Sequence, residues 1–270
     1  MTLYICALPV GCNADITYRV KEQLAQVPVI FCEDTRVTKQ LLKQLNIFNS
    51  QQLFRMDQYQ EKRSFIQFDR CIANGDVAYV SDAGVPGLAD PGAFLVSHAR
   101  SAGTHVVVLP GASALTTFIS GCGVLISAFH FGGFLPKKST DVQHAFDQII
   151  DQQQVGIWFE SPKRLLASLT NLKKQCPTIP IVVAKELTKR YETFISGSVC
   201  SVIEQLDHHQ IKGEWLFLID ARAIKKNNTD RYREIAVICK SANLTGKQVK
   251  ALAPLFDCKK NELYDYYQTL

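Results

Sequence analysis

The sequence predicts an α/β fold, and three observations favour it. In the first half, short apolar runs alternate with segments of helical periodicity, a pattern typical of a largely parallel sheet with helices on both faces. Several of these runs end in loops rich in glycine and proline, the place where open α/β sheets bind ligands. The chain of 270 residues is also long enough for two domains.

The first half is expected to alternate strand and helix from its start. Strands, each a short apolar run bounded by turn residues, are expected at residues 3–8, 29–32, 76–80 and 106–109. Helices are expected at residues 16–26, 38–45, 65–74 and 93–101. The last two helices are closed by Gly75 and Gly103.

The pattern changes near residues 121–128, where we place a domain junction. Later strands are expected at residues 129–134, 156–159, 181–184, 191–196 and 214–219, the last two being antiparallel. Residues 225–230 form a polar linker, and the residues after it predict a small helical appendage. The predicted domains are therefore residues 1–120, 121–224 and 231–270.

Composition is that of an ordinary globular protein, with 47% hydrophobic and 20% charged residues. The formal net charge of +5 suits an anionic partner such as RNA, although many metabolic enzymes share it. The nine cysteines are odd in number and lack C-x-x-C spacing, and the six histidines show no ligand spacing. We therefore expect reduced thiols in a cytoplasmic protein and no metal site.

Neither a signal peptide nor a membrane span is expected. The start enters a strand without the basic segment of a signal peptide. The most apolar stretch, residues 106–131, is broken by Pro110, Gly111, Gly121 and Gly123, so it is not expected to cross a membrane.

Three loops follow first-half strands at their carboxyl ends and predict a ligand site. They are Pro9-Val-Gly-Cys-Asn13, the stretch from Ser81 to Gly92, and Pro110-Gly-Ala-Ser-Ala114. Glycine lets the backbone approach a ligand, and Asp82 and Asp90 can accept hydrogen bonds from a ribose or an ammonium. Neither a Walker A loop nor G-x-G-x-x-G is present, so a phosphate cradle is not supported.

The longest loop, Ser81-Asp-Ala-Gly-Val-Pro-Gly-Leu-Ala-Asp-Pro-Gly92, resembles the signature of the ribosomal RNA small subunit methyltransferase I family. This family belongs to the tetrapyrrole-methylase-like superfamily. Other motifs match in the family's order over nearly the whole chain: Leu8-Pro-Val-Gly11, Asp15-Ile-Thr17, Glu33-Asp-Thr-Arg36, Pro110-Gly111, Ser113-Ala-Leu115, Gly133-Phe-Leu-Pro-Lys137, Phe159-Glu-Ser-Pro162, Arg164-Leu165, Glu186-Leu-Thr-Lys189, Glu192, Gly213-Glu214 and Lys260-Asn-Glu-Leu-Tyr264.

The resemblance implies two α/β domains with S-adenosyl-L-methionine in the cleft between them, and a homodimer. It implies 2′-O-methylation of a cytidine ribose in the decoding region of 16S ribosomal RNA, within the small subunit, and neither DNA nor a membrane as a partner. The cofactor-binding residues it implies are Leu8, Pro9, Gly11, Asp82, Ala83, Gly84, Val85, Ser113, Ala114, Phe159 and Glu160.

The chain departs from the family's pattern at several positions. Cys12 and Ala14 replace an Asn and an acidic residue, and Ala112 and Lys163 replace a proline and a histidine. A histidine-rich stretch of the family is Asp57-Gln-Tyr-Gln-Glu61 here. These polar changes bear on the target or the efficiency more than on the cofactor.

Methyl transfer to a ribose hydroxyl needs alignment and removal of the hydroxyl proton. Charged groups at strand ends in the two halves are candidates, namely Glu33, Asp34, Arg36, Lys185 and Glu186. We expect Arg36 to hold a phosphate or the sugar, and Lys185 or Glu186 to assist proton removal. Interdomain salt bridges are the alternative for each.

Basic loops are the candidates for RNA contact, because phosphate contacts position RNA without reading its sequence. They carry Lys137, Lys138, Lys163, Arg164, Lys189 and Arg190. For Lys138 or Lys163 taken alone, a solvated basic face is the favoured interpretation. Two other functions stay open. One is methylation of a tetrapyrrole or corrin precursor, and the other is a non-catalytic, RNA-binding assembly protein.

Overall fold

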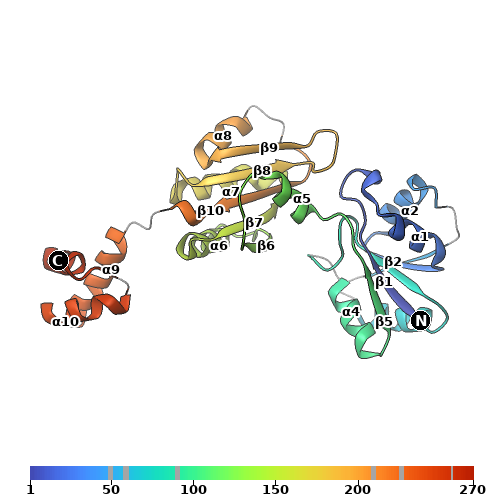
Figure 1. The fold of residues 1–270 in the computed structure, drawn as a ribbon, viewed down its shortest axis with the longest axis horizontal. Helices are drawn as coiled ribbons and strands as arrows, with labels where there is room; N and C mark the ends of the chain where they lie inside the picture. The colour runs from blue at the N-terminus through green and yellow to red at the C-terminus, as the bar shows by residue number, and fades with distance from the viewer. Residues whose placement is uncertain (48–50, 57–60, 89–91, 208–210, 225–227, 257) are drawn as a thin grey trace. The chain divides into compact units, whose positions relative to one another are not determined.

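The computed structural model describes residues 1–47, 51–56, 61–88, 92–207, 211–224, 228–256 and 258–270 (Figure 1). The chain divides into two compact units, Met1–Ala223 and Ile224–Leu270. The division predicted between residues 120 and 121 falls inside the first unit and stays a prediction. Asp57 to Gln60 and Asp90, singled out in the sequence, lie outside the described residues.

The first sheet has the strand order β3-β2-β4-β1-β5, and its described pairings are all parallel, as the alternating pattern predicts. The strands are β1 (Thr2–Cys6), β2 (Val29–Cys32), β3 (Gln52–Arg55), β4 (Val77–Val80) and β5 (His105–Leu109). The sequence interpretation missed β3, a polar edge strand whose two ends are exposed. Without an apolar run it gives no periodic signal.

Helices cover both faces of this sheet because its central strands are apolar on both sides. Cys6, Ile30 and Val80 pack in one cluster with side chains of α1 (Tyr18–Gln26) and α2 (Thr35–Gln44). Their immediate neighbours Ile5, Phe31 and Tyr79 pack in a second cluster with α3 (Glu61–Ile72) and α4 (Gly92–Ser101). Successive side chains of a strand point to opposite faces, so these two clusters lie on opposite sides of the sheet.

The second sheet has the order β6-β7-β10-β8-β9. Its strands are β6 (His130–Phe134), β7 (Val155–Glu160), β8 (Pro180–Lys185), β9 (Thr193–Ser198) and β10 (Trp215–Asp220). Strands β6 and β7 are parallel, whereas β10 pairs antiparallel with β7 and β8, and β9 pairs antiparallel with β8. The prediction that the last two strands are antiparallel is confirmed.

In the described part of the chain, the α-helices that accompany the second sheet are α5 (Ala114–Gly121), α6 (Ser139–Gln152), α7 (Pro162–Gln175) and α8 (Val199–Asp207). Leu115 and Phe118 of α5 pack against Ile157 and Leu218 on one face. Trp158 and Phe217 stack with centroids 5.5 Å apart, and Phe146 of α6 meets Trp158 edge-on at 5.8 Å. Because residues 157 and 158 alternate along β7, these aromatic rings form the core of the opposite face.

The second unit is helical, as the sequence predicts. It consists of α9 (Asn228–Ser241), α10 (Gly246–Leu252) and α11 (Lys260–Thr269) around a small core that includes Ala236 and Leu263. Helix α10 begins with a capping box between Thr245 and Gln248. The unit therefore has a hydrophobic core of its own.

The cysteines are free thiols, and five of the nine are buried, namely Cys6, Cys32, Cys122, Cys239 and Cys258. Burial raises the pKa of the Cys6 thiol to about 12 and that of Cys32 to about 11. Within the part of the chain that the structure describes, no group of His, Cys, Asp and Glu side chains is arranged to hold a metal ion. Over the same residues, no helix combines the length and apolar character that crossing a membrane requires.

Candidate functional site

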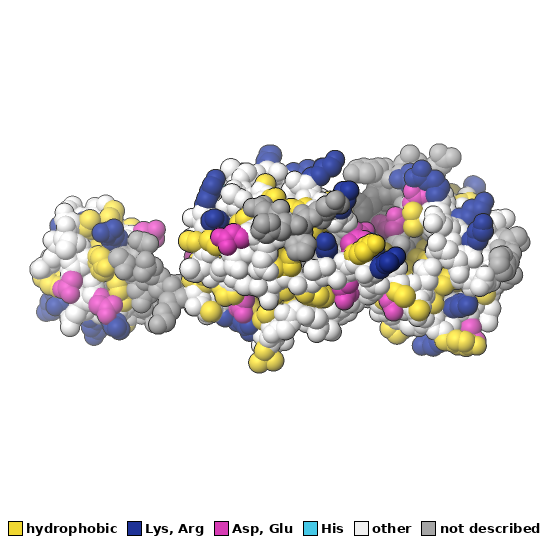
Figure 2. Space-filling view, turned by 90° about the horizontal axis from the view of Figure 1, so that it is seen from above, with side chains coloured by type: hydrophobic (Ala, Val, Ile, Leu, Met, Phe, Trp, Pro, Cys, Tyr) yellow, Lys and Arg dark blue, Asp and Glu magenta, His cyan; other side chains and the backbone are white. Residues whose placement is uncertain are grey.

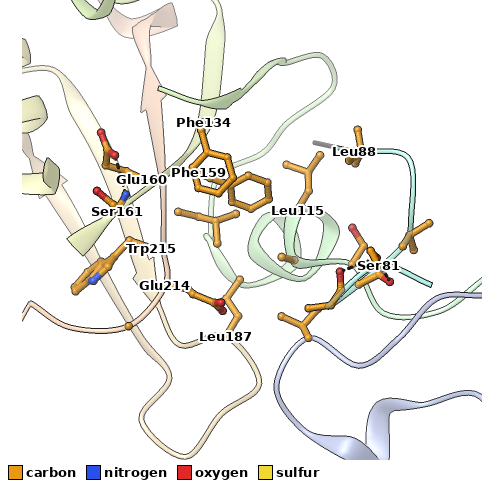
Figure 3. Close-up of a pocket in the computed structure, with 18 of the residues that line it drawn as sticks. Ser81, Leu88, Leu115, Phe134, Phe159, Glu160, Ser161, Leu187, Glu214 and Trp215 are labelled. Atoms are coloured by element: carbon orange, nitrogen blue, oxygen red, sulfur yellow. Dashed lines mark hydrogen bonds between the residues drawn. The ribbon is translucent and has the colours of Figure 1, made fainter. Parts of the chain in front are cut away.

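A cavity of about 400 Å³ opens in the first unit (Figure 3). Its first wall comes from loops at the carboxyl ends of the parallel strands and from the start of α5, with Val10, Glu33, Ser81, Ala83, Gly84, Val85, Leu88, Ser113, Ala114 and Leu115. Its second wall has Phe134, Phe159, Glu160, Ser161, Pro162, Leu187, Gly213, Glu214, Trp215 and Leu216. These residues lie at the ends of β6, β7 and β8 and at the start of the antiparallel β10. In each sheet, the strand termini at one end therefore face the cavity.

The first wall is joined by backbone hydrogen bonds between the loops after β1 and β4. The Leu8 N–H donates to the Gly84 carbonyl at 2.8 Å, and the Gly84 N–H donates to the Leu8 carbonyl at 3.1 Å. Gly84 has φ of +73°, which side chains rarely adopt. Its backbone polar groups are thus already paired, and what it offers the cavity is the absence of a side chain.

The loops after β2 and β4 are held together by reciprocal hydrogen bonds. The Asp82 N–H donates to Oε2 of Glu33 at 2.8 Å, and the Asp34 N–H donates to Oδ1 of Asp82 at 3.1 Å. Burial raises the pKa of the Asp82 carboxyl, and the bond from the Asp34 N–H opposes that rise only in part. The pair fixes Glu33, the first-wall carboxylate that lines the cavity.

The motif Glu33-Asp-Thr-Arg36 spans the N-terminus of α2, with Asp34 as the N-cap and Thr35 and Arg36 as the first helical residues. The Asp34 side chain accepts from the Arg36 N–H at 2.8 Å and so caps the helix. It also accepts from the Arg36 guanidinium, whose terminal nitrogen lies 2.6 Å from Oδ2. These bonds hold the pKa of Asp34 well below its usual range and raise that of Arg36. The Arg36 side chain is nevertheless 89% exposed.

A buried network at Glu160 supports the second wall. Its carboxylate is 1% exposed and accepts from the Ser161 N–H at 2.7 Å, from Ser168 Oγ at 2.8 Å and from Arg164 at 2.9 Å. The same Arg164 nitrogen donates to the carbonyls of Leu135 and Pro136 at 2.9 and 2.8 Å. Strand β7, helix α7 and the segment after β6 are therefore tied to one carboxylate.

The loop after β8 forms the rest of this wall and contains two unusual backbone conformations. Glu186 has φ of 54° and Thr188 has φ of 62°. Oε1 of Glu186 accepts from the Glu214 N–H and from Lys189 Nζ, both at 3.0 Å, while Lys189 also reaches Glu214 at 3.1 Å. Burial alone would raise the pKa of Glu186, but the bonds from Glu214 and Lys189 outweigh it and lower the pKa. A lowered pKa makes a carboxylate a weaker proton acceptor.

Gly11 allows this loop to approach the first half closely. A Cβ on Gly11 would lie 2.4 Å from Cγ of Lys189 and 2.8 Å from the Leu187 carbonyl. The neighbouring Cys12 N–H donates to Thr188 Oγ1 at 3.1 Å. Gly11 is therefore needed for the close contact between these two loops.

Of the residues proposed for cofactor binding, seven line the cavity: Ala83, Gly84, Val85, Ser113, Ala114, Phe159 and Glu160. Leu8, Pro9, Gly11 and Asp82 are not among the lining residues, although Leu8, Gly11 and Asp82 fix the loops that are. The sequence interpretation left Leu187 and Gly213-Glu214 unassigned although it matched both motifs. Phe134 was also left unassigned, although it lies in the matched motif Gly133-Phe-Leu-Pro-Lys137. Trp215 has no signal of its own, because apolar strand residues are ordinarily core.

The predicted catalytic residues do not line the cavity. Arg36 is exposed and follows the cavity-lining Glu33 by three positions in the sequence. Lys185 has its Nζ 5.8 Å from the centre of the Trp215 ring, and Glu186 serves the loop described above. Among the described residues, the carboxylates that line the cavity besides the buried Glu160 are Glu33 and Glu214, one from each wall.

The residues predicted to contact RNA fall into two groups. Lys137, Lys138, Lys163 and Arg190 are exposed, and Arg190 lies over the Tyr191 ring at 5.5 Å. Arg164 and Lys189 instead have the intramolecular partners given above. In Figure 2, Lys and Arg side chains dot the surface of the first unit singly and in small groups.

Comparisons with known proteins agree with this architecture. The family of Tetrapyrrole (Corrin/Porphyrin) Methylases matches residues 2–203. A solved structure of uroporphyrin-III C-methyltransferase from Thermus thermophilus has a TM-score of 0.56 at 15% identity, over 81% of this chain and 97% of that one. This likeness concerns the fold.

Curated relatives are closer in sequence. Ribosomal RNA small subunit methyltransferase I of Neisseria meningitidis serogroup B is 36% identical, over 98% of this chain and 92% of the relative. The protein of the same name from Haemophilus influenzae is 33% identical, over 98% of this chain and 95% of the relative. The chain therefore belongs to the tetrapyrrole methylase family and, within it, to the ribosomal RNA small subunit methyltransferase I family.

Proposed function

We propose that this protein transfers a methyl group from S-adenosyl-L-methionine to the 2′-hydroxyl of a cytidine ribose in the decoding region of 16S ribosomal RNA. The observation that carries the RNA part is the match of nearly the whole chain to relatives named for ribosomal RNA. The proposal includes the small ribosomal subunit as substrate, a homodimer and a cytoplasmic location.

The cavity suits the cofactor in size and chemistry. Its volume of about 400 Å³ lies within the range of small-molecule sites. The residues that would hold the cofactor are the segment Ala83-Gly-Val85, with Ser113 and Ala114 facing them and Phe159 and Glu160 on the second wall. A side chain on Gly84 would be strained at φ of +73° and would reduce the space shared with a ligand.

When bound, the cofactor supplies an electrophilic methyl group, and the chain has to align the hydroxyl and accept its proton. Glu33 and Glu214 are carboxylates that line the cavity, so either is better placed than Glu186 to take that proton. Exposed Arg36 would contact an RNA phosphate near Glu33. Lys137, Lys138 and Arg190 are further exposed cations for phosphate contact.

The test compares ribose methylation in 16S RNA from cells with and without this protein, by mass spectrometry. Small subunits from the deficient cells are then incubated with purified protein and tritiated cofactor. We expect one cytidine to lose its 2′-O-methyl group in the deficient cells and to regain it in the reaction. Unchanged 16S RNA with methyl transfer to a tetrapyrrole precursor would favour the superfamily's other chemistry. Absence of cofactor binding in calorimetry would favour an assembly protein.

A further inference from the structure

Phe134 is the most exposed aromatic side chain on the cavity wall, and its position is not the one that a regular strand would give it. It is 63% exposed and lines the cavity at the end of β6. Its ring centroid lies 5.3 Å from that of Phe159. The ring therefore packs against Phe159 on one side, and much of its remaining surface is exposed and can contact a ligand.

A β-bulge brings Phe134 to this place. Phe131 pairs with Ile157 and Phe134 with Phe159, so three steps along β6 oppose two along β7. In a regular strand, residues 131 and 134 would point to opposite faces. Here Gly133 has φ of 64° and both phenylalanine rings lie 5.3 Å from Phe159. Bulges re-aim side chains and are frequent beside active sites.

The segment that carries Phe134 is held rigidly. Arg164 donates to the carbonyls of Leu135 and Pro136, and Arg164 is itself fixed by the buried Glu160 carboxylate. Exposed Lys137 and Lys138 follow immediately. An aromatic ring at the cavity (Figure 3) and two exposed cations that follow it in sequence thus belong to one braced segment.

We infer that Phe134 is a stacking platform for the base of an unpaired nucleotide, with Lys137 and Lys138 contacting its flanking phosphates. The inference rests on the proposed function and names how that site selects its acceptor. Unpaired RNA bases are bound by stacking on aromatic side chains beside basic groups. A paired nucleotide offers no free base face to this ring, so the platform selects an unpaired residue for methylation.

Three variants distinguish a contact of Phe134 with the RNA base from a contact with the cofactor. Phe134→Ala removes the ring, Phe134→Leu keeps apolar bulk without an aromatic face, and Phe134→Trp keeps the face. Phe129→Ala is the matched control, because Phe129 is 41% exposed on the same stretch but does not line the cavity. Each is assayed by single-turnover methylation of small subunits lacking the modification, at saturating cofactor, and by calorimetry with the cofactor alone.

We expect the subunit concentration for half-maximal rate to rise about tenfold in Phe134→Ala and Phe134→Leu, in line with the contribution of a stacked base. Phe134→Trp and Phe129→Ala should stay near the wild-type value, and cofactor affinity should stay unchanged in all four. Unchanged subunit dependence in Phe134→Ala would overturn the inference. So would weaker cofactor binding with unchanged subunit dependence, which would make Phe134 a wall of the cofactor site. Wild-type protein that methylates no ribosomal RNA would overturn the proposed function itself.

Discussion

Two arginine–carboxylate pairs stand near the cavity, and they differ in almost every physical respect. Arg36 and Asp34 are two residues apart, and the arginine side chain is 89% exposed. Arg164 and Glu160 bridge a strand and a helix, and the carboxylate is 1% exposed. An exposed local pair contributes little to folding and can exchange its partner for a ligand. A buried pair with further hydrogen bonds is part of the fold, and removing one member leaves a charge without compensation.

The largest effect is expected at the buried pair. Arg164→Ala would leave the Glu160 carboxylate with Ser161 and Ser168 alone and would free the carbonyls of Leu135 and Pro136. We expect a loss of about 3 kcal/mol in the free energy of unfolding. Urea unfolding followed by circular dichroism measures it. Lys163→Ala, one residue earlier and exposed, is the control that should keep wild-type stability.

A stable Arg164→Ala protein with impaired subunit binding would reverse the assignment. Arg164 would then be a direct RNA contact, as the sequence predicts, and the intramolecular bonds would be incidental.

The sequence predicted the features that depend on local patterns and missed those that depend on contacts between distant residues. Short apolar runs separated by helical periodicity predicted the parallel sheet, because strands buried on both faces are continuously apolar and helices with one buried face are periodic. The glycine-rich loop predicted the first cavity wall for the same local reason. By contrast, the role of Arg164 depends on carbonyls 28 and 29 residues away, and no local pattern reveals that pairing. The helix cap at Asp34 could have been predicted, because Asp before a helix is a standard start signal. It would have placed the start of α2 at Thr35, as in the structure.

At the exposed pair the expected effect is on rate. Arg36→Ala should lower the single-turnover methylation rate about tenfold if the guanidinium aligns an RNA phosphate, because that interaction matters in the transition state. Thermal stability should stay near wild type, since Asp34 still caps α2 through the Arg36 backbone N–H. Melting temperature and rate are measured on the same preparation. A wild-type rate would remove Arg36 from the mechanism.

Salt dependence is expected to change by a smaller amount. Lys137→Gln with Lys138→Gln removes two exposed cations without touching the Glu160 network. For each phosphate that the protein no longer neutralises, the slope of log affinity against log salt should fall by about one. Subunit binding is titrated between low and moderate salt. Lys173→Gln with Lys174→Gln, which removes two exposed cations in the last turn of α7, is the matched control and should leave the slope unchanged. An unaltered slope in the Lys137 and Lys138 double variant would place the RNA elsewhere.

The smallest effect is expected at Glu186, whose side chain is less exposed than that of Arg36 and more exposed than that of Glu160. Its side chain is 24% exposed, and hydrogen bonds from Glu214 and Lys189 lower its pKa despite the opposing effect of burial. A carboxyl whose pKa is lower in the folded state than in the unfolded state stabilises the fold at pH values above its unfolded-state pKa. That pKa is 4.5 for Glu186. That contribution is lost as the pH falls through the folded pKa. Glu186→Gln should therefore be slightly less stable than wild type at neutral pH, and the difference should shrink as the pH falls below that value.

Denaturant unfolding at a series of pH values measures this difference in the free energy of unfolding. Glu204→Gln, at an exposed position of α8, is the control and should show no such trend. If the Glu186→Gln difference grows on acidification, the pairing with Lys189 and Glu214 does not stabilise the loop. A Glu186→Gln protein with full stability and a greatly reduced methylation rate would instead return Glu186 to the catalytic candidates, because its carboxylate would then act on the substrate and not on the fold.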